Sequence, residues 1–391
     1  MKLLALGGAG YMGELLVRQL IKRSDHEIMI ADKDIDKAKK LASSLGKKVS
    51  AKSIDADDFT SLVQIMKDAD ITVNTIGPYY KVGANILKAA IAARTNFVDI
   101  CDDYDATIDE LNLGKEAEEA GIIAIIGAGA SPGLTNMFAK WGADKLERVN
   151  EIHTLWCESA VDPTGPAAVR HWLNSIHGNI PTYKNGKWIT VQAFSEPEIV
   201  RFPHPINEIE LRHVGHPEPV TLPRYIEGVK LVTNKGAIYP SFMNKLYETM
   251  SIIGFGSNKE FVVREGVSLP LRDLASRLIR SMPHFAPELF PKLLAEQEER
   301  YEGIGSGFKT VIRGEAQGKT IEYSYEVVSS TTPLVTTVPA AIIALMVSRK
   351  EIKHKGVHAP EGVVNPDMFF KEFEGCGITI WQSKKETGKL R

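Results

Sequence analysis

The chain has 391 residues, of which 43% are hydrophobic and 25% are charged. At about 100–200 residues per domain, this length predicts two or three domains with a large buried core. The 47 Lys and Arg residues nearly balance the 49 Asp and Glu residues, which gives no electrostatic basis for a nucleic-acid or membrane-surface partner. No apolar run approaches the ~20 residues that cross a bilayer, so the sequence argues against an integral membrane protein. Three widely spaced cysteines argue against disulfides and predict a cytoplasmic protein.

The first 130 residues alternate between short apolar strands and helices of 10–15 residues. The predicted strands are Lys2–Leu6, Glu27–Ala31, Val49–Ile54, Ile71–Thr75, Phe97–Ile100 and Ile122–Ile126, and the predicted helices are Tyr11–Lys22, Ile35–Leu45, Phe59–Met66, Ala84–Ala93 and Asp109–Ala120. Strands rich in Ile and Val that alternate with helices are typical of a parallel sheet covered on both faces. The pattern predicts a doubly wound Rossmann α/β domain.

Residues 134–333 differ in character, with partly alternating strands and loops rich in proline and histidine. The predicted strands include Ile152–Trp156, Trp188–Val191, Thr310–Gly314 and Thr320–Val328. These features predict an inserted α+β domain with an antiparallel sheet. Helical periodicity returns over Val338–Val347 and Pro366–Phe373. We therefore expect residues 334–391 to return to the first domain, which is formed by residues 1–133.

A glycine pattern lies between the first strand and the first helix. Gly8-Ala9-Gly10-Tyr11-Met12-Gly13 has the G-x-G-x-x-G spacing of a dinucleotide-binding loop. Gly8 would permit a tight turn, Gly10 would admit a pyrophosphate close to the backbone, and Gly13 would let the helix pack closely on the strand. The helix N-terminus would supply N–H groups and a positive dipole end for the phosphates. These residues predict a nicotinamide dinucleotide as cofactor.

Two acidic residues at strand ends bear on the choice of cofactor. Asp32 lies 19 residues beyond Gly13 (32 − 13), where a carboxylate accepts hydrogen bonds from the ribose hydroxyls and repels a 2′-phosphate. Lys33 could neutralise such a phosphate, so the sequence favours NAD and leaves NADP open. Asp55 is placed to contact the adenine, or else to cap the next helix.

The ligand is expected beyond the carboxyl ends of the first, fourth and fifth strands, where the strand order of such a sheet reverses. The fourth strand leads into Thr75, Gly77 and Pro78, which are predicted to contact the cofactor. The fifth leads into Asp102 and Asp103, whose carboxylates would stabilise a cation that develops on a substrate, or would cap the following helix. The Gly127–Gly133 segment after the sixth strand is interpreted either as a second phosphate-binding loop or as a crossover into the middle domain.

Three segments resemble the saccharopine dehydrogenase family. They are GGAGYMG at the start, NTIGPYYKVGANILKAAIAARTNFVDICDDYD, and EAGIIAIIGAGASPGLTNMFA; the C-terminal stretch with Pro360-Glu361 and Phe369-Phe370 is also similar to the family's ending. The resemblance spans nearly the whole chain and fades over 180–310. It implies an inserted domain that carries substrate contacts and a dimer interface, so a homodimer is expected. Asp32 departs from the basic or small residue that NADP-using members tend to have.

The resemblance implies NAD(P)-linked chemistry at a carbon–nitrogen bond of an amino acid, through an imine, with lysine or saccharopine as substrate. A developing iminium requires a nearby carboxylate, for which Asp102 and Asp103 are the candidates, with Tyr79 as a proton relay. Arg170 and Arg224 are candidate clamps for the substrate carboxylate. Thr135 and Asn136 are expected to contact the substrate.

The sequence leaves two alternatives to this interpretation. Histidines gather in the middle domain without dense ligand spacing, so no metal site is predicted; His171 or His216 could donate a proton instead. The second alternative is a nucleotide-binding sensor or assembly protein without turnover, since fold does not fix function.

Overall fold

The computed structural model describes residues 1–162, 164–240, 242–301 and 305–389. They divide into two compact units, here called the first unit (Met1–Met137 with Pro333–Gly377) and the inserted unit (Phe138–Thr332 with Ile378–Arg391). None of the helices in these ranges is both long and apolar enough to cross a membrane.

The first unit is built on a parallel sheet of seven strands in the order β17-β6-β5-β4-β1-β2-β3. Its strands are β1 (Lys2–Leu6), β2 (Glu27–Asp32), β3 (Val49–Ser53), β4 (Ile71–Asn74), β5 (Asn96–Asp99), β6 (Ile123–Ile125) and β17 (Gly356–His358). β1 pairs with both β2 and β4, so the strand order reverses beside β1 as predicted. The doubly wound Rossmann architecture is confirmed, and β17 shows that the chain returns to this sheet after the insertion.

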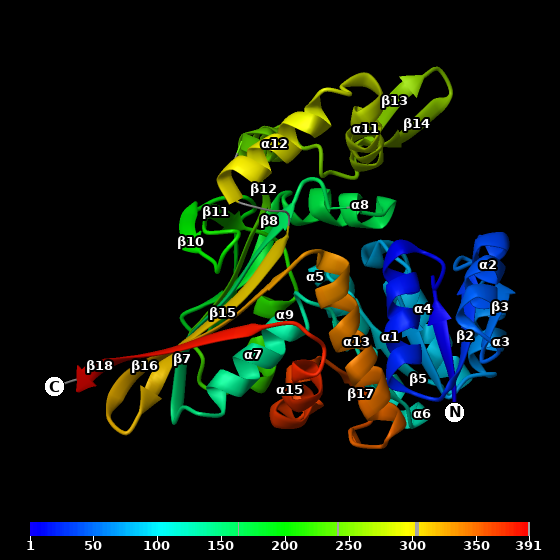
Figure 1. Cartoon of the computed structure of the whole chain (residues 1–391), viewed down its shortest axis with the longest axis horizontal. Helices are drawn as coiled ribbons and strands as arrows, with labels where there is room; N and C mark the ends of the chain where they lie inside the picture. Colours follow the sequence, from blue (N-terminus) through cyan, green and yellow to red (C-terminus); the bar gives the residue numbers. More distant parts are fainter. Residues whose placement is uncertain (163, 241, 302–304, 390–391) are drawn as a thin grey trace. The chain divides into compact units, whose positions relative to one another are not determined.

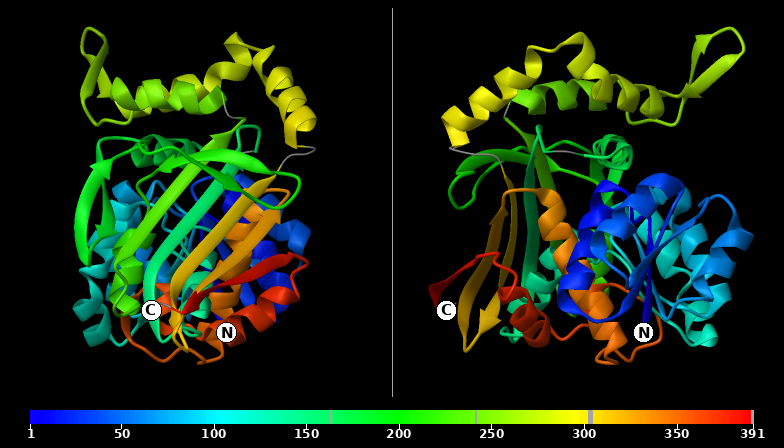
Figure 2. Two further views of the ribbon diagram at one scale, coloured as in Figure 1. Left: turned by 90° about the vertical axis from the view of Figure 1, so that its left-hand side faces the viewer. Right: turned by 45° about the vertical axis from the view of Figure 1, so that its right-hand side comes forward.

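The first unit contains the following helices. They are α1 (Tyr11–Arg23), α2 (Ile35–Leu45), α3 (Phe59–Met66), α4 (Tyr79–Ala93), α5 (Tyr104–Leu111), α6 (Gly114–Ala120), α7 (Leu134–Ala143, which passes into the inserted unit), α13 (Thr332–Ser348), α14 (Pro360–Val363) and α15 (Pro366–Glu374). Figure 1 and both panels of Figure 2 show α13 running alongside α1. α13 is apolar and buried along nearly its whole length, which is typical of a helix enclosed by other elements. The strands and helices share one core that includes Leu4, Met29, Ile86 and Phe97.

Two predicted helices differ from the observed ones. α4 begins at Tyr79, five residues before the predicted start at Ala84, because Pro78 occupies the N-cap and the Asp103 carboxylate accepts the Tyr80 N–H. The predicted helix Asp109–Ala120 is two helices, α5 and α6, with a turn at Asn112 and Leu113.

The inserted unit is built on a nine-stranded sheet whose main path is β10-β11-β12-β7-β15-β16-β18, with β8 and β9 attached at β12. Its strands are β7 (Arg148–Ser159), β8 (Asn179–Lys184), β9 (Lys187–Gln192), β10 (Glu198–Arg201), β11 (Glu208–His213), β12 (Leu231–Tyr239), β15 (Ser306–Ala316), β16 (Lys319–Ser329) and β18 (Ile380–Lys389). The predicted antiparallel sheet is in fact mixed, because β12 pairs parallel to β7 over nine residues, from Leu231 to Tyr239. The long strands lie side by side in Figure 2.

Helices and a small hairpin complete the inserted unit. They are α8 (Pro166–Ser175), α9 (Glu218–Tyr225), α10 (Phe242–Ile252), α11 (Leu271–Phe285), α12 (Leu289–Tyr301) and the hairpin β13 (Glu260–Arg264) with β14 (Val267–Pro270). α11 runs next to α8 (Figure 1). The sequence prediction assigned 334–391 as a whole to the first domain. β18 departs from that assignment, because it pairs with β16 in the sheet of the inserted unit.

Candidate functional site

The glycine loop connects β1 to α1 and closes against the end of β4. Gly7 has φ of +71°, and a Cβ there would lie 2.8 Å from Ile76 Cγ1. At Gly13 a Cβ would lie 2.1 Å from the Gly7 carbonyl oxygen, so the fold itself requires glycine at both positions. Gly10 is exposed, and the only protein atom that a Cβ there would approach within the described residues is the same Gly7 carbonyl oxygen, at 3.1 Å. The outer side of Gly10 therefore has room for a ligand.

The N-terminus of α1 is suited to phosphate. Its N-cap is Gly10, which has no side chain. No side chain therefore caps the N–H groups of the first helical turn. Tyr11 is exposed and Met12 is half-buried beside it. Uncapped N–H groups at the positive end of a helix dipole bind anions. The turn predicted for Gly8 is made by Gly7 instead, and Gly8 is buried with Ala9 at the base of the loop.

Asp32 is the last residue of β2 and connects two loops. Its Oδ2 accepts the Ala9 N–H (3.0 Å), and its Oδ1 accepts the Asp34 N–H (3.1 Å). The half-buried carboxylate is thus fixed beside the glycine loop, where a ribose would lie. Lys33 is exposed next to it. Asp55 is also exposed, and its Oδ1 accepts the Asp57 N–H (3.0 Å), while Asp58 caps the next helix.

The end of β4 is held by side chains that bond to the backbone. The Thr75 hydroxyl donates to the Leu6 carbonyl (2.8 Å), which holds Thr75, Gly77 and Pro78 near the end of β1. The Tyr79 hydroxyl donates to the Asn74 carbonyl (3.0 Å). Burial, followed by the nearby Asp99, raises the pKa of Tyr79 well above its ordinary value. This environment favours a supporting role for Tyr79 over the proposed proton relay.

The carboxylates after β5 have different environments. Asp103 is buried, and its Oδ2 accepts the Tyr80 N–H (3.1 Å), so it anchors the first turn of α4. Asp102 is half-buried, which leaves it the better candidate for contact with a substrate. Asp99, at the end of β5, is fully buried, and its Oδ1 accepts the N–H groups of Cys101 (3.0 Å) and Gly127 (2.8 Å).

The Gly127–Gly133 segment folds back on itself. Leu134 N–H donates to the Gly129 carbonyl (2.8 Å), and Gly133 N–H donates to Asn136 Oδ1 (3.1 Å). Asn136 Nδ2 also donates to Glu361 Oε1 (2.9 Å). Because these bonds engage the loop's own groups, they favour the crossover interpretation over a second phosphate-binding loop. Thr135 and Asn136 are fully buried and support the loop.

The two candidate arginine clamps lie in the inserted unit. Arg170, on α8, forms an ion pair with Asp273 on α11 (Nε–Oδ1 2.9 Å), and a quarter of its side chain is exposed. Arg224, at the end of α9, is exposed; its Nε donates to the Val220 carbonyl (3.1 Å), and its guanidinium lies over the Trp188 ring. Arg170 is therefore positioned by a charged partner, whereas Arg224 is held by its own helix.

A buried chain of ionisable groups joins α8 to α9. His171 Nε2 lies 3.2 Å from His216 Nε2, and His216 Nδ1 lies 3.4 Å from Glu218 Oε2. All three residues are buried, Glu218 completely. The Trp156 ring packs on His216 at a centroid distance of 5.1 Å, in space left by Gly236. A carboxylate in line with two imidazoles can hold a proton at a defined nitrogen.

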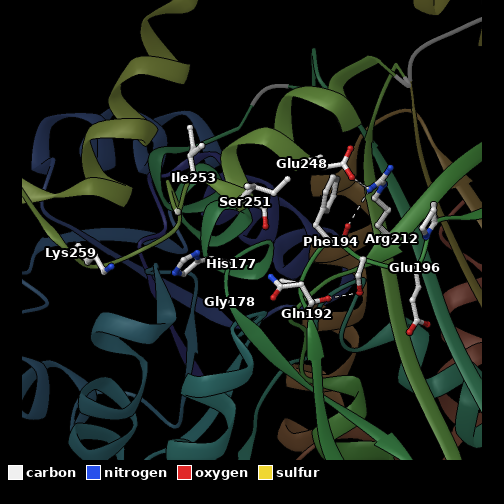
Figure 3. Close-up of a pocket in the computed structure, with 15 residues that line it drawn as sticks. His177, Gly178, Gln192, Phe194, Glu196, Arg212, Glu248, Ser251, Ile253 and Lys259 are labelled. Atoms are coloured by element: carbon white, nitrogen blue, oxygen red, sulfur yellow. Dashed lines mark hydrogen bonds and ion pairs between the residues drawn. The ribbon is translucent and has the colours of Figure 1, made fainter.

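A cavity of about 750 Å³ opens elsewhere in the inserted unit (Figure 3). Its wall carries Arg212, which donates to Glu248 Oε1 (2.7 Å) and to the Phe194 carbonyl (3.3 Å). None of the predicted site residues lines it. The arginine of this cavity is thus already paired with two carboxylates, those of Glu210 and Glu248.

Comparison with known proteins identifies the family. The model of the saccharopine dehydrogenase NADP binding domain matches residues 3–125. The model of the saccharopine dehydrogenase C-terminal domain matches residues 129–378. The chain belongs to the saccharopine dehydrogenase family. It is accordingly an NAD(P)-dependent oxidoreductase, as the glycine loop predicts.

Relatives within the family match over nearly their full length. Carboxynorspermidine synthase of Vibrio alginolyticus is 24% identical, with 98% of this chain and 97% of the relative covered. Carboxyaminopropylagmatine dehydrogenase of Synechocystis is 23% identical, with 95% of both covered. The structure of apo saccharopine dehydrogenase (L-Glu forming) from Saccharomyces cerevisiae matches with a TM-score of 0.68 at 17% identity, over 99% of this chain and all of that one. It shows the same saccharopine dehydrogenase fold.

Sequence reasoning missed several residues of this saccharopine dehydrogenase family member. The Gly7-Gly8 doublet was a usable signal for the turn at Gly7. Asp99 lies in the predicted fifth strand, but nothing in the sequence indicates that its side chain is buried. Glu218 carried no signal, because burial of a glutamate depends on how distant elements pack.

Proposed function

We propose that this chain catalyses NAD(P)-linked oxidation or reduction at the carbon–nitrogen bond of an amino acid, with hydride transfer through an imine of the substrate. The observation that carries the proposal is the buried Glu218–His216–His171 chain in an NAD(P)-dependent oxidoreductase. Amine–imine chemistry exchanges a proton for every hydride, and this chain of groups can provide that proton.

The cofactor fits the residues of the first unit. The open side of Gly10 and the uncapped first turn of α1 would hold the pyrophosphate, and Asp32 would bind the ribose hydroxyls. When bound, the nicotinamide accepts or supplies the hydride. Asp32 favours NAD, whereas the family model is described as NADP binding. We therefore propose NAD as the preferred cofactor and NADP as the alternative.

The contacts of the histidine chain favour particular positions for a proton. His216 Nδ1 lies 3.4 Å from Glu218 Oε2 without a hydrogen bond between them, so an ionised Glu218 acts on His216 through its charge and favours a proton on Nδ1. The Nε2 of His216 then accepts from Nε2–H of His171. A proton gained or lost by His171 then belongs to its Nδ1. Glu218 stabilises the resulting imidazolium through His216, as a buried carboxylate does for a histidine base.

The remaining predicted residues have supporting roles. We propose that the half-buried Asp102 stabilises the positive charge of the substrate iminium, and that Arg170 binds its carboxylate. The names of the relatives favour a carboxylated secondary amine, of the carboxynorspermidine kind, ahead of lysine or saccharopine.

The test follows NADH and NADPH formation or consumption with carboxynorspermidine, saccharopine, lysine and ornithine, in both directions. Turnover with any one of them supports the proposal and selects the substrate and cofactor. Cofactor binding without turnover on an extended panel of amines would contradict it and would favour the nucleotide-binding sensor.

A further inference from the structure

A second cavity in the inserted unit combines an aliphatic wall with two opposite charges. It has a volume of about 350 Å³ and lies among the β7–α8 loop, α10, α11 and α12. Val161, Val169, Met243 and Ile279 contribute to its wall. This volume lies within the range of small-molecule sites. The cavity contains none of the residues assigned above to cofactor or proton transfer.

Asp162 is the buried charge of this cavity. The residue is 6% exposed, and its Oδ2 accepts the Thr332 N–H (2.8 Å). Within the described ranges, Oδ1 is buried and accepts no hydrogen bond. A buried carboxylate oxygen without a donor destabilises a protein unless a ligand or ion provides one. Burial also raises the pKa of Asp162, and the bond from Thr332 opposes this effect.

Arg280 is the second charge. Arg280 is an exposed residue on α11 and lines the same cavity. In the part of the chain that the structure describes, no carboxylate forms an ion pair with it. This differs from the larger cavity of Figure 3, where Arg212 is bonded to Glu248.

We propose that this cavity binds a short aliphatic molecule with an ammonium group at one end and a carboxylate at the other. The ammonium group donates to Asp162 Oδ1, the carboxylate pairs with Arg280, and the carbon chain lies against Val161, Val169 and Ile279. The ligand class is thus an ω-amino acid or an amino acid with a basic side chain. The inference concerns binding by the inserted unit and does not depend on the proposed reaction.

The experiment measures binding to the full chain by calorimetry, without cofactor, so that a failure of the proposed reaction cannot affect it. The probes are 5-aminopentanoate, pentylamine and pentanoate. We expect 5-aminopentanoate to bind at least tenfold more tightly than either singly charged probe. Failure of 5-aminopentanoate to bind at millimolar concentration, or equal binding of all three, would overturn the proposal.

Two variants assign the ends of the ligand. Asp162→Asn keeps an oxygen to accept the Thr332 N–H, and we expect it to weaken 5-aminopentanoate and pentylamine at least tenfold. Arg280→Gln changes an exposed helix position, so folding should be unaffected, and we expect it to weaken 5-aminopentanoate and pentanoate. Arg277→Gln, also exposed on α11 but outside the cavity, is the matched control. Wild-type affinities in both test variants would refute the assignment.

Discussion

The carboxyl groups of Asp99, at the end of β5, and Glu110, on α5, are both fully buried and close enough to influence each other's pKa. Gly83 makes room for this pair, since a Cβ there would lie 2.6 Å from Glu110 Oε1. Burial raises the pKa of Asp99 to about 7 and raises the pKa of Glu110 well above its ordinary value. Within the described residues, Asp99 Oδ2 and both Glu110 oxygens accept no hydrogen bond, so burial favours the protonated form of these carboxyl groups.

Stability should therefore depend on pH through Asp99. The pKa of an aspartate in the unfolded chain is about 4. Between that pH and about 7, the folded chain therefore holds more protons than the unfolded chain. The stability from this group is fully present below about pH 4 and is lost as the pH rises through about 7. One such proton changes the free energy of unfolding by ~1.4 kcal/mol per pH unit.

Asp99→Asn should flatten this dependence. The Asn side-chain oxygen can still accept from Cys101 and Gly127, while its amide group can donate to Glu110. Urea unfolding at several pH values would measure the change, with Asp36→Asn, at an exposed position on α2, as the control. An unchanged slope in Asp99→Asn would contradict the raised pKa of Asp99.

Glycine substitutions should separate folding from cofactor binding. Gly13→Ala places a methyl group 2.1 Å from the Gly7 carbonyl oxygen, so we expect it to lower the free energy of unfolding by at least ~1–3 kcal/mol. At Gly10 a Cβ would lie 3.1 Å from the same oxygen, a smaller conflict than at Gly13, so we expect Gly10→Ala to lower the stability less than Gly13→Ala does and to weaken cofactor binding at least tenfold. Thermal unfolding and a cofactor titration would test both. Full cofactor affinity in Gly10→Ala would contradict a pyrophosphate at this loop.

Asp32→Ala should weaken NAD binding roughly 10- to 100-fold, because it removes charge-assisted hydrogen bonds to the ribose. NADP binding should change much less, since the same substitution removes a repulsion of the 2′-phosphate. Fluorescence titration with both cofactors would test this, with Asp36→Ala as the control. Equal losses for both cofactors would refute the ribose assignment.

Glu218→Gln should lower turnover 10- to 100-fold without changing cofactor affinity, because the His171 imidazolium loses a buried counter-charge. The pH–rate profile should change more in Glu218→Gln than in a variant that removes an exposed carboxylate. Glu196→Gln is the matched control: Glu196 pairs with His213 at 3.2 Å in the same unit, but its side chain is largely exposed. Identical profiles for the two variants would exclude the proposed proton path.

Arg170 and its partner should respond differently to mutation. Arg170→Met is expected to raise the KM for the substrate at least tenfold, whereas Asp273→Asn should raise it less than threefold. The ion pair itself is mostly buried, with 25% of the Arg170 side chain and 16% of the Asp273 side chain exposed. If both variants raise KM equally, Arg170 only connects α8 to α11.

The sheet of the first unit could be predicted because its strands are apolar and its turns are short. The same reasoning failed where an element is stabilised by a distant residue. α4 begins at Tyr79 because the Asp103 carboxylate caps it from the end of β5, and no local pattern reveals such a cap. The parallel pairing of β12 with β7 likewise depends on the connections between distant strands.

For the candidate site, too, local patterns could be predicted from the sequence and contacts between distant residues could not. The glycine loop and Asp32 have a fixed spacing, so they could be found in the sequence. Arg170 was selected by residue type alone, and its partner Asp273 lies about a hundred residues away in the chain. The order His171, His216, Glu218 depends on how α8 and α9 pack, which periodicity does not specify.

The position of β17 has a consequence for the synthesis of the chain. β6 is made early, at Ile123–Ile125, but its outer neighbour β17 is at Gly356–His358, after the whole inserted unit. Until that segment leaves the ribosome, the nascent first unit exposes β6 as an unpaired strand edge, which is a site for pairing with other chains. Premature termination within the inserted unit should therefore yield fragments that aggregate, and chaperones that cover strand edges should matter most during this interval.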